Sequence, residues 1–402
     1  MMNDVLFLAH RIPYPPDRGD KIRSWHLLRH LSTLARVHLA CFADDEADAA
    51  HLPALREALN GRLGEARVEI RRIGKAAAGA RALFEGRPVS LTLFDSASLR
   101  DFVRRLLATR DVGTIFAFSG QMAQFVPARA PQRFVMDFGD MDSEKFAAYA
   151  DEGGLMAPIH RREARTLFAF ERKVAARAEI SLFVSAAEAA LFRDKVRLPG
   201  ADIRALENGV DLKYYDPAPP VAPAEAPHPL IVFTGQMDYA PNVEAVRRFA
   251  QEVLPRLPGA TFAIVGRNPA DSVRRLAAGQ VIVTGAVDDV RAWLAAADVV
   301  VAPLRIARGI QNKVLEAMAM GKPVVASPAA YESIAAEPGR DLIVAETEED
   351  QARAIAALLA DPARGAAIGA AARRRMEEAY RWDAQLAPLA EIVGPPGRRE
   401  AA

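Results

Sequence analysis

The most constraining feature of this sequence is an alternation of short β-rich runs with longer helical patterns, which occurs twice along the chain. The first series begins with Val5–Ala9 and extends to Ile180–Ser185, and the second begins with Leu230–Thr234 and extends past Asp341–Val344. Alternation of this kind is typical of parallel sheets, because each parallel connection has to cross back over the sheet. The pattern therefore predicts an α/β protein with two doubly wound, Rossmann-like domains.

A proline-rich segment, Pro217–Pro229, separates the two series. Proline at this density cannot continue a helix or the ladder of a sheet, so the segment is predicted to be a linker. A chain of 402 residues is also long enough for two domains. We expect an N-terminal domain over residues 1–205, a junction and linker over 206–229, a second domain over 230–378, and a C-terminal helix and tail over 379–402.

Charge and composition exclude some classes of protein. Apolar residues make up 51% of the chain, which is enough for two cores and excludes a disordered chain. The net charge of +1 argues against a dedicated nucleic-acid binder, which is usually basic overall. We therefore expect no nucleic-acid partner.

Cysteine usage indicates a cellular compartment. Cys41 is the only cysteine, so the chain cannot form an internal disulfide, and a reducing compartment fits best. Because it lies in the apolar run Val37–Phe42, it is predicted to be a packed strand residue rather than a nucleophile. The start of the chain shows no signal-peptide pattern, and no apolar stretch approaches a membrane span. We expect a cytoplasmic protein, with peripheral attachment to the inner membrane face left open.

The segment Gly309–Val325, with the sequence GIQNKVLEAMAMGKPVV, resembles the donor-binding signature of glycosyltransferase family 4, whose fold is called GT-B. The opening segment Arg11–Arg23 is similar to the first loop of a bacterial exopolysaccharide subgroup of sugar transferases. Other segments resemble family landmarks in the expected order: Asn208–Asp211, Gly235–Ala245, Val283–Gly285, Arg340–Val344 and Tyr380–Trp382. The ordered set covers nearly the whole chain and implies two Rossmann-like domains that face each other across a cleft.

The resemblance implies that the second domain binds the nucleotide-sugar donor. A helix starting near Asn312 would offer free N–H groups and a positive dipole end to a diphosphate. Lys313 would neutralise phosphate charge, and Glu316, one turn deeper, would accept hydrogen bonds from the ribose hydroxyls. The alternative for these two residues is an exposed Lys–Glu pair worth a few tenths of a kcal/mol. The remaining candidates for donor binding are Gly309, Gly235 and Gln236.

The loop before this helix departs from the family pattern. Many members have a second glutamate that contacts the transferred sugar, and Arg308 stands at its position. Arg305 and Arg308, together with Lys313, are therefore candidates for stabilising the charge of the leaving diphosphate. Solvated loop arginines are an equally good interpretation of the first two. The sequence identifies no nucleophile or general base.

The first domain contributes candidates for the acceptor side of the cleft. Gly19 follows the first strand in a turn that allows close approach of a ligand, and Asp20 stands where family members often have a second glycine. Lys21 and Arg23 begin the next helix and would hold a donor phosphate or an anionic acceptor, or would be surface charges. His10 ends the first strand, where it would line the cleft or be packed in the core.

A metal site is not expected. Asp140-Met-Asp142 matches the metal-binding Asp-x-Asp of the other large glycosyltransferase fold, but three-residue matches arise often by chance. The two-domain architecture implied by the resemblance favours a metal-independent reaction. We expect no cofactor other than the nucleotide-sugar substrate.

The function implied by the resemblance is transfer of a hexosyl group from a UDP- or GDP-sugar, with retention of configuration. The expected acceptor is lipid-linked or a polysaccharide, in exopolysaccharide or surface-glycan synthesis. A nucleotide-sugar epimerase of the same fold and a non-catalytic nucleotide-sugar-binding subunit are the alternatives. Arg161–Arg177 and Phe102–Leu107 combine basic and apolar residues and are candidates for contact with an anionic membrane. In the alternative interpretation their aromatic residues face the domain core.

Overall fold

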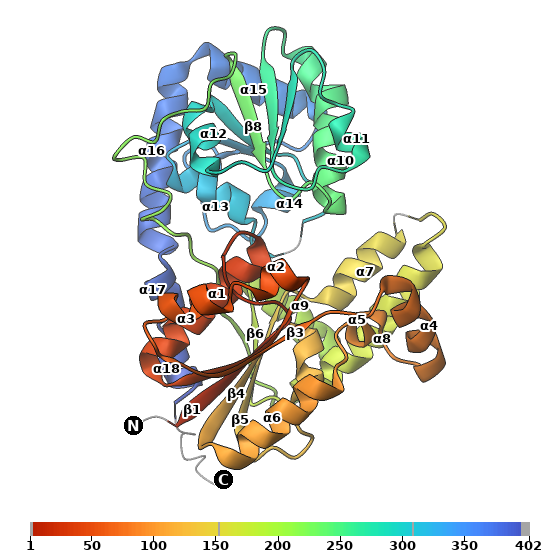
Figure 1. Cartoon of the computed structure of the whole chain (residues 1–402). Coiled ribbons are helices and arrows are strands. Elements are labelled where there is room, and N and C mark those ends of the chain that lie inside the picture. Colours follow the sequence, from red (N-terminus) through yellow and green to blue (C-terminus); the bar gives the residue numbers. More distant parts are fainter. Residues whose placement is uncertain (1–2, 152, 308, 395–402) are drawn as a thin grey trace. The chain divides into compact units, whose positions relative to one another are not determined.

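The computed structural model describes residues 3–151, 153–307 and 309–394, and the chain divides into two compact units (Figure 1). Unit 1 contains the chain up to Glu207 together with the segment from Leu386 onward, and unit 2 is Asn208–Gln385. The proline-rich segment 217–229 contains no helix or strand and belongs to unit 2. The division between the units therefore precedes this segment.

Unit 1 is built on a parallel sheet of seven strands in the order β3-β2-β1-β4-β5-β6-β7. The chain runs outward from β1 to β3, returns to β4 beside β1, and then runs outward in the other direction, which is a doubly wound order. The strands are β1 (Asp4–Ala9), β2 (Val37–Ala43), β3 (Leu63–Ile70), β4 (Val112–Phe118), β5 (Arg133–Gly139), β6 (Ile180–Phe183) and β7 (Ile203–Ala205).

Helices cover both faces of this sheet. Because side chains alternate along a strand, Leu6 and Leu8 share one face of β1, where they join a core cluster that includes Phe102 and Phe192. On the other face, α1 packs against β1, β2 and α18. The helical elements are α1 (Gly19–Leu34), α2 (Glu46–Ala49), α3 (Leu52–Ala58), α4 (Lys75–Glu85), α5 (Val89–Leu93), α6 (Ala97–Thr109), η1 (Gly120–Phe125), α7 (Asp142–Asp151), α8 (Ala157–Ala175), α9 (Ala186–Val196) and α18 (Leu389–Ile392).

Unit 2 contains a second parallel sheet, with six strands in the order β10-β9-β8-β11-β12-β13. The strands are β8 (Leu230–Thr234), β9 (Thr261–Val265), β10 (Val281–Gly285), β11 (Val299–Ala302), β12 (Val324–Ala326) and β13 (Ile343–Val344). The helical elements are α10 (Ala240–Arg248), η2 (Phe249–Val253), η3 (Leu254–Arg256), α11 (Asp271–Arg274), α12 (Val290–Ala296), α13 (Asn312–Ala319), α14 (Pro328–Tyr331), α15 (Glu348–Ala360), α16 (Pro362–Ala379) and α17 (Trp382–Leu386).

Each sheet has one strand at which its direction of growth reverses. In unit 1 this strand is β1, which lies between β2 and β4, and in unit 2 it is β8, which lies between β9 and β11. Open α/β sheets bind ligands beyond the carboxyl ends of the strands at such switch points. His10 directly follows β1 and Gly235 directly follows β8, so each unit places a predicted candidate at its own switch point.

The structure confirms the prediction of two parallel α/β sheets. Cys41 is fully buried in β2, as predicted, and burial raises the pKa of its thiol. Within the described ranges, no single helix is both long and apolar enough to cross a bilayer. In the part of the chain that the structure describes, one pair of helices, α15 and α16, meets the length and composition of a span when taken together, and the two are bent by 105°.

Candidate functional site

The central group of the candidate site in unit 2 is the ammonium of Lys313, in the first turn of α13. Lys313 Nζ donates a hydrogen bond to Asn242 Oδ1 at 2.6 Å and lies 4.5 Å from the centroid of the Phe233 ring. Burial lowers the pKa of Lys313 to about 7, an effect that the nearby Glu316 only partly opposes. An anion placed beside this side chain would restore its full positive charge.

Glu316 lies one turn further along α13, and Tyr215 donates its phenolic hydrogen to the Glu316 carboxylate. Burial raises the pKa of Glu316 to about 7, although Tyr215 and Lys313 both favour the ionised form. The hydroxyl of Tyr215 thus takes the place of the hydroxyl donors that the sequence interpretation assigned to a ribose. Sequence reasoning missed Tyr215, although it lies four residues after the Asn208–Asp211 landmark.

The loop after β8 is attached to Lys313 through the side chain of Asn242. Asn242 Nδ2 donates to the carbonyl oxygen of Gln236 at 2.9 Å, while its Oδ1 accepts from Lys313. Gly235 has a φ of 155°, and a Cβ there would lie 2.8 Å from Asn242 Nδ2. Glycine is therefore required where this loop meets the amide. Sequence reasoning missed Asn242, although it lies inside the Gly235–Ala245 landmark.

A second glycine allows the loop after β9 to lie against the loop after β8. Gly266 has a φ of 156°, and a Cβ there would lie 1.6 Å from the carbonyl oxygen of Gly235. No side chain can be accommodated at this distance. The two loops therefore pack backbone against backbone at the carboxyl ends of β8 and β9.

The N-terminus of α13 is held by a neutral contact. Asn208 Nδ2 donates to Asn312 Oδ1 at 3.3 Å, and the side chain of Gln311, the N-cap residue, makes no capping hydrogen bond to the helix. Gly309, in the preceding loop, is buried and has a φ of 60°, which a residue with a side chain adopts only with strain. The structure thus brings Asn312, Lys313 and the loop after β8 together within unit 2.

Arg305 forms ion pairs with two carboxylates of unit 2. Arg305 Nη2 lies 3.0 Å from Glu348 Oε1, and Arg305 Nη1 lies 3.7 Å from Glu244 Oε1. Both carboxylates also pair with the buried Arg248. The Arg305 side chain is 61% exposed, so it can exchange these partners for another anion. Arg308, the other arginine proposed for the diphosphate, lies outside the described residues.

In unit 1, the residues after β1 form a network of charges rather than an open turn. His10 is buried, and its Nε2 lies 3.0 Å from Asp20 Oδ2. Burial lowers the pKa of His10, whereas Asp20 raises it less strongly. Burial favours the neutral form of Asp20, but contacts with His10, Arg11 and Arg18 hold its pKa well below the usual range. Asp20 thus fixes the orientation of the buried His10 ring, and a role for His10 on the acceptor side stays a prediction.

The two basic candidates of unit 1 are buried in ion pairs. Lys21 Nζ pairs with Asp48, and Arg23 Nη2 lies 2.7 Å from Asp137 Oδ2. Both basic side chains are nearly inaccessible, which excludes the surface-charge interpretation. Gly19, the remaining candidate of unit 1, is the first residue of α1.

The Asp-x-Asp segment follows β5. Asp142 pairs with Lys145, and Asp140 Oδ1 is buried without a hydrogen-bond partner among the described residues. Burial, reinforced by the nearby Glu188, raises the pKa of Asp140 to about 7. Within the described ranges, no three or more His, Cys, Asp or Glu residues are arranged as metal ligands.

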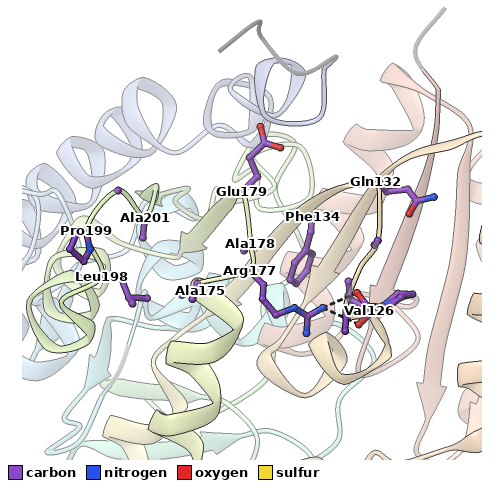
Figure 2. A pocket seen from close by; sticks show the side chains of 15 residues that line it. Val126, Gln132, Phe134, Ala175, Arg177, Ala178, Glu179, Leu198, Pro199 and Ala201 are labelled. Atoms are coloured by element: carbon purple, nitrogen blue, oxygen red, sulfur yellow. Dashed lines mark hydrogen bonds between the residues drawn. The ribbon is translucent and has the colours of Figure 1, made fainter. Parts of the chain in front are cut away.

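A depression of about 950 Å³ lies in unit 1 near the amino ends of β5 and β6 (Figure 2). Phe134 and Leu198 line it, and Arg177 Nη2 donates to the carbonyl oxygens of Val126 and Pro127 at 3.1 and 2.9 Å. The predicted candidates of unit 1 follow the carboxyl end of β1, whereas the depression lies at the amino ends of the parallel strands. We therefore assign this depression no part in the site.

Comparison with known proteins gives both a sequence family and structural neighbours. Residues 228–361 match the family described as glycosyl transferases group 1. The GDP-mannose-dependent alpha-(1-6)-phosphatidylinositol monomannoside mannosyltransferase of Mycobacterium tuberculosis is 28% identical over 319 residues, which cover 72% of this chain and 78% of that protein. Its counterpart from Mycolicibacterium smegmatis is 30% identical over 253 residues, which cover 57% of this chain and 65% of that protein.

Solved structures of low identity share the fold over almost the whole chain. Sucrose-phosphate synthase from Thermosynechococcus elongatus has a TM-score of 0.72 at 18% identity, with 97% of this chain and 98% of that chain covered. Anabaena HepE in complex with UDP-glucose has a TM-score of 0.66 at 17% identity, with 97% and 99% covered.

These findings define the class of protein: a glycosyltransferase with the two-domain GT-B fold. Its group 1 glycosyltransferase domain, residues 228–361, lies within unit 2 and contains Asn242, Lys313 and Glu316. The similarity of Arg11–Arg23 to an exopolysaccharide subgroup stays a prediction.

Proposed function

We propose that the protein transfers a mannosyl group from GDP-mannose to a lipid-linked acceptor in the synthesis of a surface glycan. The single observation that carries the donor site is the buried Lys313 ammonium, which a neutral amide positions beside the N-terminus of α13. A diphosphate at this place would gain from the helix dipole and from the cation. GDP-mannose is the first choice because the curated relatives are described as GDP-mannose-dependent.

The remaining groups of the site suit the nucleotide. The Glu316 carboxylate can exchange the hydroxyl of Tyr215 for ribose hydroxyls without losing a hydrogen bond. The Gly235–Gln236 loop, which Asn242 fixes, presents backbone groups at the carboxyl end of β8. Arg305 can leave Glu348 for a phosphate oxygen, because its side chain is largely exposed. We assign Lys313 and Arg305 to charge on the leaving diphosphate and Glu316 to the ribose.

The reaction proposed at this site is displacement of the nucleoside diphosphate by an acceptor hydroxyl, with retention of configuration. The bond between the anomeric carbon and the diphosphate oxygen breaks, and the acceptor oxygen bonds to that carbon. The leaving diphosphate takes the acceptor's proton. The protein contributes orientation and preorganised positive charge, which are electrostatic effects on the transition state. We propose that no metal ion is required.

A lipid-linked acceptor is proposed because the curated relatives act on phosphatidylinositol mannosides, which are lipids. The acceptor would bind to unit 1, and the enzyme would work as a cytoplasmic protein attached peripherally to the inner membrane face. The exopolysaccharide role indicated by Arg11–Arg23 is the second candidate, with a lipid-linked polysaccharide as acceptor.

The test compares nucleotide sugars in the same assay. Purified protein is screened by thermal shift against GDP-mannose, UDP-glucose, UDP-N-acetylglucosamine and the free nucleoside diphosphates. We expect the largest stabilisation from GDP-mannose and GDP. A preference for UDP-sugars would refute GDP-mannose as donor. Conversion of the donor into an epimeric sugar nucleotide, without release of nucleoside diphosphate, would indicate the epimerase alternative.

A further inference from the structure

Unit 1 exposes a group of large apolar side chains on two of its elements. In the described part of unit 1, every large hydrophobic side chain with high exposure lies at the end of α4 or at the start of α8. We call this group the apolar tip; its members are Leu83 (65% exposed), Phe84 (94%), Leu155 (99%), Met156 (52%) and Ile159 (51%). Exposed apolar groups that lie together mark interaction sites in soluble proteins.

The two elements that carry the apolar tip are fixed to each other (Figure 1). Arg162 Nη2, on α8, donates to the carbonyl oxygen of Ala82 on α4 at 2.9 Å and to that of Arg87 at 3.2 Å. Glu163 accepts hydrogen bonds from the backbone N–H groups of Val89 and Ser90, at the start of α5. Ile159 lies three residues before Arg162 on the same side of α8, and Leu83 and Phe84 directly follow Ala82. Both parts of the apolar tip therefore belong to one braced assembly.

The polarity of α4 is the reverse of that of an ordinary surface helix. Among the α4 side chains that the structure describes, only those of Ala78 and Ala82 are buried, whereas the larger apolar side chains point to solvent. Ala76, Ala77 and Ala80 are also exposed, so the solvent side of α4 is largely apolar. A surface helix normally places polar residues there. Packing against the core of unit 1 therefore does not account for the apolar side chains at positions Leu83 and Phe84.

The helix that begins at the apolar tip, α8, also carries four exposed basic side chains. Arg161, Arg165, Arg172 and Lys173 are exposed, and none of them forms an ion pair with another described residue. By contrast, Arg81 and Arg87, which flank Leu83 and Phe84, are paired with Glu85 and Asp95. Unpaired cations on the same element as an exposed apolar group are complementary to anionic lipid headgroups above an acyl layer.

The apolar residues of the two segments that the sequence offered for membrane contact face the core of unit 1. Leu167 and Phe102 are buried, and Phe168 and Phe170 pack against the core cluster of unit 1. The alternative interpretation of these segments, in which their aromatic residues face the core, is therefore correct. The basic residues of α8 stay exposed, and the apolar contribution has to come from the apolar tip.

We propose that the apolar tip inserts into the boundary between headgroups and acyl chains of an anionic bilayer, while Arg161, Arg165, Arg172 and Lys173 contact lipid phosphates. This inference extends the lipid-linked acceptor of the proposed function by naming the surface that meets the lipid. Binding to vesicles needs neither donor nor acceptor. Failure of docking and failure of the proposed transfer reaction are therefore distinguishable.

The test uses a polarity-sensitive fluorophore attached to new cysteines. Because the native Cys41 is fully buried, Phe84→Cys and Leu155→Cys can be labelled selectively. Ala356→Cys, at an exposed position of α15 in unit 2, is the matched control. With vesicles of equal parts phosphatidylcholine and phosphatidylglycerol, we expect a blue shift from the labels at 84 and 155 and none from the label at 356. Absence of a shift at 84 and 155 would overturn the proposal.

Flotation of unlabelled variants separates the apolar contribution from the charged one. Leu83→Ser/Phe84→Ser is expected to lower binding to anionic vesicles at least about tenfold, because each inserted side chain contributes strongly to partitioning. Arg161→Gln/Arg165→Gln is expected to weaken binding and reduce its dependence on salt. Unchanged flotation of the first variant would refute insertion. If that variant instead abolished self-association in sedimentation analysis and bound vesicles normally, the apolar tip would be an interface with a second copy.

Discussion

Lys313 Nζ lies 2.6 Å from Asn242 Oδ1, so a neutral amide, and not a carboxylate, accepts the hydrogen bond of this buried ammonium. A carboxylate partner would neutralise the cation, whereas an amide only orients it. The site therefore retains an attraction for a diphosphate that a structural ion pair would have lost. This contrasts with Lys21 and Arg23 of unit 1, whose charges are already matched by Asp48 and Asp137.

Removal of the Lys313 ammonium should weaken binding of nucleoside diphosphates more than binding of nucleosides. For Lys313→Ala we expect a loss of about 1.5–3 kcal/mol toward GDP, the usual contribution of a hydrogen bond to a charged group. Affinity for guanosine should change little. Titration calorimetry measures both, and Lys313→Arg is the control that retains the charge. Equal losses for GDP and guanosine would contradict a role at the diphosphate.

Glu316→Ala should weaken binding of any ligand that contains the ribose. We expect a loss of about 2–4 kcal/mol, because two charge-assisted hydrogen bonds disappear and their contributions are not fully additive. Calorimetry with GDP checks the value, and Glu349→Ala, at an exposed position of α15, is the matched control. Unchanged affinity of the Glu316 variant would show that the ribose binds elsewhere.

The net number of protons that the protein takes up when it binds GDP should change sign near pH 7. The pKa of Lys313 is lowered to about 7, and a diphosphate raises it, so binding above pH 7 takes up protons. The pKa of Glu316 is raised to about 7, and ribose hydroxyls lower it, so binding below pH 7 releases protons. Calorimetry in buffers of different ionisation enthalpy measures the exchange. Lys313→Arg should abolish the uptake and Glu316→Gln the release; persistence of both would contradict the assignments.

Asn242→Asp should convert the site from an oriented cation into an ion pair. The new carboxylate would raise the pKa of Lys313 and compete with the diphosphate, so GDP affinity and proton uptake at pH 8 should both fall. Asn242→Ala should also destabilise the fold by about 1–3 kcal/mol, because it leaves Lys313 Nζ and the Gln236 carbonyl without this partner. Thermal unfolding checks the second effect. A wild-type affinity in the aspartate variant would argue against Asn242 as the positioning group.

Activity should persist in excess EDTA, because the proposed site relies on the helix dipole and basic side chains. The assay is release of GDP from GDP-mannose in the presence of acceptor, and Asp140→Asn and Asp142→Asn serve as companion variants. Loss of activity in EDTA, followed by recovery with Mg²⁺ or Mn²⁺, would instead assign Asp140 and Asp142 as metal ligands.

The sequence was informative wherever the signal was local. Residues 5–9 of β1 and 230–233 of β8 are continuous apolar runs, and α13 shows its helical spacing directly. The strands, the helix and the shared side of Lys313 and Glu316 were therefore predictable. Contacts between loops were not. Asn242 and Lys313 are 71 residues apart, and they meet only because β8 and β11 are neighbours in the sheet.

In unit 1, too, contacts between residues far apart in the sequence could not be predicted. Arg23 and Asp137 are separated by 114 positions, so nothing near Arg23 in the sequence indicates that its charge is matched. Lys21 has its partner Asp48 in the connection after β2, which the chain order alone does not place. The exposure of Leu83 and Phe84 was equally hidden, because apolar residues in a helical pattern ordinarily predict a buried side.

The most direct test of the account is product analysis by mass spectrometry, with purified enzyme, GDP-mannose and a phosphatidylinositol mannoside as acceptor. We expect one GDP released for each hexosyl unit added to the lipid, and a large loss of both products in Lys313→Ala. Conversion of GDP-mannose into another GDP-sugar, or transfer that proceeds normally in Lys313→Ala, would contradict mannosyl transfer at the Lys313 site.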